Sequence, residues 1–198
     1  MLKLWICVFA AVMCCWFVFA AVFLFRNKPA KTTETKRAPS AIAGLVLQSL
    51  AYSIVWIGRA DYKKPRLPAS LALNVAIGAF TVILAVISVW LVTAAVRKLG
   101  KQWALNARIV EGHELVTDGP YRLMRHPIYT GMFGMLVATG MAMSAWSTLA
   151  AGAVIFFAGT MLRLKSEEKL LKQTFGEEFE RYAAKTPPLI PGLIGRRK

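Results

Sequence analysis

The fold is decided by residues 127–164, which read PIYTGMFGMLVATGMAMSAWSTLAAGAVIFFAGTMLRL. This apolar stretch is too long for a single membrane-spanning helix, which needs about 20 apolar residues. Small polar residues interrupt it midway, from Ser144 to Thr148. We therefore expect a hairpin of two spanning helices that turns near Ala145.

Three further apolar runs precede this hairpin, at residues 4–25, 41–58 and 71–96. The first run is longer than a typical signal peptide and no small-x-small cleavage site follows it, so we expect a retained span. The chain is 57% hydrophobic, well above an ordinary soluble domain. We predict an all-α, polytopic membrane bundle of about five transmembrane helices. It forms a single domain, residues 1–198, in which residues 1–96 supply three N-terminal spans.

The basic residues are distributed unevenly between the two sides of this bundle. Of the 25 Lys and Arg residues, 20 fall in segments 26–40, 97–126 and 163–198. The positive-inside rule places these segments, and with them the C-terminus, in the cytosol. The net charge is +15, and the basic residues flank the apolar runs. We therefore expect anionic membrane lipids, and no nucleic acid, as partners.

Two of these cytosolic segments combine charged and apolar residues. Residues 97–118 are expected to form an interfacial helix that ends in a turn at Asp118-Gly119-Pro120. Residues 163–182 are expected to be helical, and the prolines beyond residue 186 end regular structure. The segment 175–192 is expected to fold back as a lid over the cytosolic mouth of the hairpin.

Five polar side chains should meet at that mouth. Pro127 suits the first turn of a helix, which places His126 at its entrance and Tyr129 one turn deeper. The next helix of the hairpin ends where this one begins, so Arg163, Glu167 and Glu168 return to the same level. Arg163 and Glu167 are four residues apart and can pair. Taken singly, these residues could also be interfacial anchors or a solvated helix face.

The histidines and cysteines give no sign of a metal site. The chain has only His113 and His126, and its cysteines all lie in the first apolar run. This arrangement offers neither zinc-ligand spacing nor a disulfide framework. We expect no dedicated metal site, and His113 is expected to be an ordinary loop histidine.

Four motifs follow one another in residues 110–192. They are His113-x-Leu-Val-Thr-x-Gly-Pro-Tyr-Arg122, Arg125-His-Pro-x-Tyr-x-Gly131, Arg163-x-x-x-Glu-Glu-x-Leu170 and Phe175-Gly-x-x-Phe-x-x-Tyr182, followed by a Pro-rich end. In these motifs the chain resembles the isoprenylcysteine carboxyl methyltransferase family, which is related to phospholipid N-methyltransferases. The chain has Phe179 and Lys185 where family members usually have Tyr and Arg. A lysine cannot hold a carboxylate with two parallel bonds as arginine can.

The resemblance implies an S-adenosylmethionine-dependent membrane methyltransferase whose core is residues 110–192. It implies catalytic roles for Glu168 and Arg163. The implied cofactor-binding residues are Tyr121, Arg125, His126, Tyr129, Gly131, Glu167 and Glu168. The implied acceptor is lipid-like or prenylated, and methylation of a carboxyl oxygen is the leading expectation. A carboxylate acceptor is already ionised and needs no base.

Three other functions remain open at this point. A phospholipid-type N-methyltransferase would require a proton acceptor for its amine. A sterol-type reductase using NADPH is disfavoured by the Glu167-Glu168 pair, which reductase relatives generally lack. A non-enzymatic membrane protein with a degenerate site is the third. The acceptor atom and the oligomeric state are left open.

Overall fold

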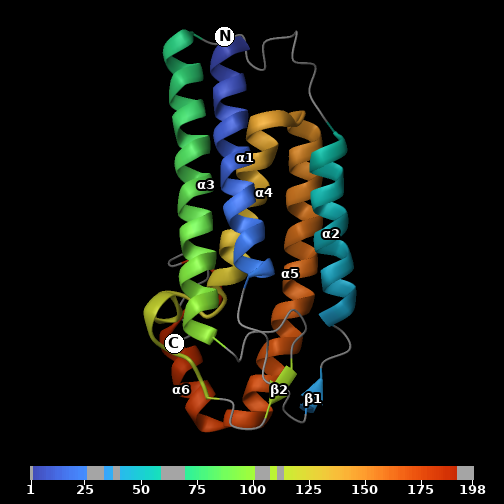
Figure 1. Cartoon of the computed structure of the whole chain (residues 1–198). Coiled ribbons are helices and arrows are strands. Elements are labelled where there is room, and N and C mark those ends of the chain that lie inside the picture. The colour runs from blue at the N-terminus through green and yellow to red at the C-terminus, as the bar shows by residue number, and fades with distance from the viewer. Residues whose placement is uncertain are drawn as a thin grey trace.

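The computed structural model describes residues 2–25, 34–37, 41–58, 70–100, 108–110 and 114–190. These residues contain six α-helices, one 3-10 helix and a pair of short strands (Figure 1). The all-α prediction is confirmed, and the strand pair is a small addition to it. The elements are α1 (Leu2–Leu24), β1 (Glu34–Arg37), α2 (Ala41–Ile57), α3 (Leu71–Leu99), β2 (Arg108–Val110), the 3-10 helix Gly119–Arg122, α4 (Pro127–Met143), α5 (Trp146–Phe175) and α6 (Glu177–Lys185).

Helices α1 to α5 form an up-and-down bundle, while α6 and the antiparallel β1–β2 pair lie at one end of it (Figure 1). Helices α1, α3 and α5 are long and apolar enough to cross a membrane. Helices α2 and α4 have 17 residues each, which is the lower limit for a span. The chain is therefore a multi-pass membrane protein, and five apolar helices occupy the five predicted stretches.

The α4–α5 turn confirms the predicted hairpin and ties it to α2. Helix α4 ends at Met143 and α5 begins at Trp146. The Ser144 hydroxyl donates to the carbonyl of Val55 at 2.6 Å, and the Ala145 amide donates to the carbonyl of Gly58 at 3.0 Å. The last carbonyls of a helix have no partner within it. The turn supplies partners at the end of α2 and fixes that helix against the hairpin.

Glycines allow the helices of the bundle to approach one another closely. A Cβ atom on Gly44 would lie 2.5 Å from the carbonyl oxygen of Gly159, and one on Gly131 would lie 2.9 Å from that of Ser88. Small residues at contacts are a usual feature of membrane helices, because lipid supplies no hydrophobic drive for association. The α2–α5 and α3–α4 contacts thus depend on backbone proximity.

Two predictions about the basic segments are corrected. Among the described residues of 97–118 there is no interfacial helix: α3 ends at Leu99 with Gly100 at φ 53°, β2 occupies Arg108–Val110, and residues 114–118 are not helical. The predicted helix 163–182 is instead the end of α5, a break at Gly176 (φ 51°) and the separate helix α6. Both breaks use a conformation that glycine adopts readily. His113 and the end of the predicted lid, from Pro191, lie outside the described residues.

Candidate active site

A cluster of charged side chains occupies the end of the bundle where α4 begins and α5 extends beyond it. His126 directly precedes α4 and is 7% exposed, and Tyr129 lies in the first turn and is 5% exposed. Glu167 and Glu168 come from the last third of α5. The hairpin thus brings together groups that are about 40 residues apart in sequence, as the topology predicted.

Two basic side chains, Arg125 and His126, contact the same carboxylate oxygen of Glu168. Arg125 places Nε at 2.9 Å and Nη2 at 2.7 Å from Glu168 Oε1, and His126 Nε2 lies 3.1 Å from the same atom. Charge-assisted bonds of this kind are the stronger class of protein hydrogen bond. The Glu168 side chain nevertheless keeps 28% of its surface exposed. Part of the Glu168 side chain therefore remains accessible to a ligand.

His126 lies between the two carboxylates. Its Nδ1 is 3.5 Å from Glu167 Oε2, while its Nε2 faces Glu168. Burial alone would lower the pKa of His126, but the hydrogen bonds and charges of Glu167 and Glu168 outweigh burial and raise the pKa above its ordinary value. A protonated imidazole can donate to both carboxylates at once. The cluster therefore favours the charged form of His126.

Glu167 also joins Tyr129 and Arg163. The Tyr129 hydroxyl donates a short hydrogen bond to Glu167 Oε1, and Arg163 Nη2 lies 3.9 Å from that oxygen. The Arg163 guanidinium also lies over the Tyr129 ring, 5.0 Å from its centroid, within cation–π range. The predicted i, i+4 pair is present, and it belongs to a larger buried arrangement.

The C-terminal segment folds back onto this cluster, as predicted for the lid. The amides of Arg125 and His126 donate to the carbonyls of Pro187 and Pro188, each at 2.9 Å. The Arg125 Nη1 group donates at 2.9 Å to the carbonyl of Ala183 and, in a short bond, to that of Thr186. A cation at the last carbonyls of a helix is well placed. Arg125 therefore joins the end of α6 to Glu168.

Tyr121 lies near Glu167 and Tyr182, and the described residues offer its hydroxyl no hydrogen-bond partner. The residue is 7% exposed, and its carbonyl accepts from the Tyr182 hydroxyl at 2.6 Å. Its own hydroxyl is buried without a hydrogen-bond partner among the described residues. Burial, with the charge of Glu167, raises the pKa of Tyr121, so the hydroxyl stays neutral. An orphaned buried hydroxyl in a native protein requires an explanation, and a bound ligand is one.

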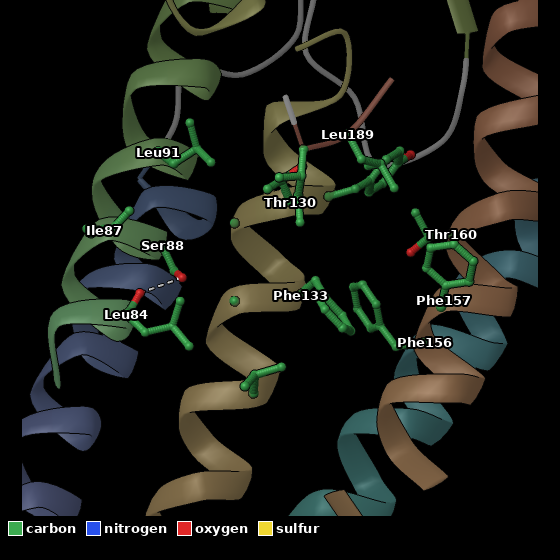
Figure 2. Close-up of a pocket in the computed structure, with 15 residues that line it drawn as sticks. Leu84, Ile87, Ser88, Leu91, Thr130, Phe133, Phe156, Phe157, Thr160 and Leu189 are labelled. Carbon is green, nitrogen blue, oxygen red and sulfur yellow. Dashed lines mark hydrogen bonds between the residues drawn. The ribbon is translucent and has the colours of Figure 1, made fainter. Parts of the chain in front are cut away.

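An apolar pocket of about 300 Å³ lies among residues of α3, α4 and α5 (Figure 2). Figure 2 shows its walls: Leu84, Ile87 and Leu91 on α3, Phe133 on α4 and Phe156 and Phe157 on α5, with Leu189 at one end. Tyr129 also lines the pocket. Its hydroxyl donates to Glu167, so Tyr129 belongs both to the pocket lining and to the charged cluster.

Gly131 lies at the contact between α3 and α4, and Gln48 contacts Arg163 from α2. Gly131 faces α3, where a side chain would collide with Val92, and it also lines the apolar pocket. The structure thus gives Gly131 a packing role, and its cofactor role stays a prediction. Gln48 on α2 was not predicted, yet its Oε1 accepts from Arg163 Nη1 at 3.1 Å. A polar side chain inside an apolar span was the available signal.

The family profile described as phospholipid methyltransferase matches residues 76–178, from within α3 to the first turn of α6. The chain belongs to this family. Protein-S-isoprenylcysteine O-methyltransferase B of Arabidopsis thaliana is 36% identical over 87 residues, which are 44% of each chain. The Schizosaccharomyces pombe protein-S-isoprenylcysteine O-methyltransferase is 35% identical over 82 residues, 40% of this chain and 35% of that protein. The recognised resemblance is confirmed at the level of the family.

Not every relative is named as a methyltransferase, so the matches establish the family but not the activity. The nickel-cobalt-cadmium resistance protein NccN of Alcaligenes xylosoxydans xylosoxydans is 37% identical over 111 residues, 55% of this chain and 51% of that protein. The chain thus matches about half of the length of these relatives or less. Within the part of the chain that the structure describes, no group of three His, Cys, Asp or Glu side chains is arranged to hold a metal ion.

Proposed function

We propose that the protein transfers a methyl group from S-adenosylmethionine to a lipid-like or prenylated acceptor at the end of the bundle that carries α6. The observation that carries the proposal is the junction at Tyr129. This residue is part of the lining of the apolar pocket, and its hydroxyl donates a hydrogen bond to Glu167. A charged site for a soluble cofactor therefore adjoins an apolar site for a hydrocarbon group.

The residues present fit the chemistry of the cofactor. S-adenosylmethionine carries a sulfonium, an ammonium and a carboxylate, and when bound it supplies an electrophilic methyl group. Glu167 and Glu168 are 22% and 28% exposed and can accept from the ammonium or lie beside the sulfonium. Arg125 and the start of α4 can hold the carboxylate. The unpaired Tyr121 hydroxyl offers a further buried contact.

The apolar pocket fits the hydrocarbon part of an acceptor. Ile87 and Phe157 are 53% and 49% exposed on the outer surface of α3 and α5, and Ile190 is 40% exposed. The pocket therefore opens toward the lipid-facing side of the bundle. An acceptor held in the bilayer can enter laterally, and each CH₂ group that it buries contributes about 0.8 kcal/mol.

For a carboxylate acceptor, the residues of the site act mainly by orientation. An acceptor oxygen attacks the methyl carbon as the carbon–sulfur bond breaks, and sulfur keeps the electron pair, so no proton moves. Tyr129 lies at the junction of pocket and cluster, with Arg163 over its ring, and the two side chains can align the reacting groups. An amine acceptor, as in phospholipid N-methylation, would also need Glu167 or Glu168 to take its proton. Carboxyl O-methylation remains our leading proposal.

The topology and the extent of the functional unit belong to the same proposal. The end with α6 contains segments 97–126 and 163–198, which hold 15 of the 25 basic residues. We place this end in the cytosol, where the soluble cofactor is available. Residues 110–192 form the proposed methyltransferase core, and the three N-terminal spans contribute to its surroundings.

Cofactor binding by the purified protein tests the proposal. We expect calorimetric titration to show binding of S-adenosylhomocysteine and no binding of NADPH. Binding of NADPH alone would support the reductase alternative and overturn the methyltransferase. Absence of binding to either compound would favour a non-enzymatic protein. With cofactor bound, a prenylated cysteine carboxylate and a phosphatidylethanolamine vesicle can be compared directly as acceptors.

A further inference from the structure

Gln48 is a buried polar residue that belongs to no recognised motif. It lies midway along α2, outside the family match that begins at residue 76, and is 1% exposed. Its Oε1 accepts from Arg163 Nη1 at 3.1 Å, and its Nε2 donates to the Thr160 hydroxyl at 2.9 Å. A polar side chain inside an apolar span is costly, so it is usually retained for function.

Chemistry fixes the orientation of the Gln48 amide. A guanidinium group can only donate hydrogen bonds, so the amide oxygen must face Arg163. The Thr160 hydroxyl can accept a hydrogen bond, so the amide nitrogen of Gln48 donates to it. Each end of the amide therefore has a partner of the correct type, and both partners lie on α5. Gln48 is a rigid acceptor aimed at one nitrogen of Arg163.

Helix α2 also controls the stem of Arg163. A Cβ atom on Gly44 would lie 2.5 Å from Cγ of Arg163 and the same distance from the carbonyl oxygen of Gly159. The absence of a side chain at Gly44 thus leaves the space through which the arginine passes. Gly44 and Gln48 are one helical turn apart, so a single face of α2 holds both the stem and the head of Arg163.

We propose that Gln48 is a positioning residue for the cofactor site and acts through Arg163. The guanidinium that Gln48 holds lies over the Tyr129 ring and faces Glu167. Without the amide oxygen, Arg163 loses a hydrogen bond. Its guanidinium is then held less firmly beside Tyr129 and Glu167. The inference rests on the proposed function, and it extends the site to a span that none of the motifs includes.

The test is a set of substitutions read by binding of S-adenosylhomocysteine. Gln48→Met keeps the length and apolar fit of the side chain but removes the acceptor, and we expect affinity to fall about ten-fold. Tyr52→Phe is the matched control, because it removes another hydrogen bond of α2, the part-buried bond from the Tyr52 hydroxyl to the carbonyl of Met132 at 2.7 Å. This control should lower thermal stability without changing affinity.

The route through Arg163 is tested in an Arg163→Met background. If Gln48 acts through Arg163, adding Gln48→Met to that background should cost no further affinity. A further ten-fold loss there would overturn the inference, as would an unchanged affinity of folded Gln48→Met. Gln48→Asn, which retracts the amide by one CH₂, replaces Gln48→Met if the latter does not fold. Failure of the parent to bind overturns the proposed function together with this inference, whereas tight binding by all Gln48 variants overturns only the inference.

Discussion

Replacing Glu168 by Gln is the sharpest perturbation of the proposed cofactor site. The amide keeps the size of the side chain but removes the charge that faces Arg125 and His126. Each hydrogen bond to a charged group contributes roughly 1.5–3 kcal/mol, and a ligand cation at the exposed part of the carboxylate would lose a bond of this kind. We therefore expect the affinity for S-adenosylhomocysteine to fall about ten- to a hundred-fold.

The controls separate a binding role from a general loss of structure. His126→Ala should also weaken binding, and the double variant should cost less than the two single losses together, since both residues contact the same oxygen. Glu178→Gln changes an exposed carboxylate on α6 and should leave affinity unchanged. Calorimetry on folded protein measures all four. If Glu168→Gln binds as tightly as the parent, the glutamate pair is only a solvated helix face.

Two further predictions concern topology and pH. Cysteines can be placed at the exposed positions Ser147 and Gln173 in a chain without its native cysteines. They should react with an impermeant reagent from opposite sides of the membrane, with position 173 on the cytosolic side. Labelling of both from one side would contradict the hairpin. His126 has a raised pKa, so its charged form stabilises the folded protein fully below the unfolded-state pKa of about 6.5, and this stabilisation is lost as pH rises through the higher folded-state pKa. The difference in melting temperature between the parent and His126→Gln should therefore shrink as the pH rises above about 6.5, and a difference that is constant with pH would refute the assignment of charge.

Hydropathy predicts the bundle well because a bilayer restricts the available structures. Backbone groups in hydrocarbon must be paired within the segment, so long apolar runs can be assigned to helices with little ambiguity. The turn at Ala145 follows from the length of the run and its polar interruption. The segments outside the bundle are less constrained. There, the charge pattern predicted helices at 97–118 and 163–182. In the structure, helices end at Gly100 and Gly176 instead.

The site was predictable in part, for a related reason. The motifs and the hairpin together place His126, Tyr129 and the glutamates at one level, and the structure joins them by hydrogen bonds. The partners of Arg125 could not be predicted, because they are backbone carbonyls at Ala183 and Thr186 and carry no side-chain signal. Gln48 could have been noticed as a polar residue in an apolar span, but its partner could not have been identified without the α2–α5 contact.

The four residues 187–190 serve two compartments at once. The carbonyls of Pro187 and Pro188 accept hydrogen bonds from the amides of Arg125 and His126. Leu189 and Ile190 line part of the apolar pocket. This short strap therefore cannot leave the charged cluster without also uncovering the apolar pocket. In the proposed function, a cofactor at the cluster and an acceptor in the pocket would favour the same closed position of the strap. Their binding would then be thermodynamically linked through residues 187–190.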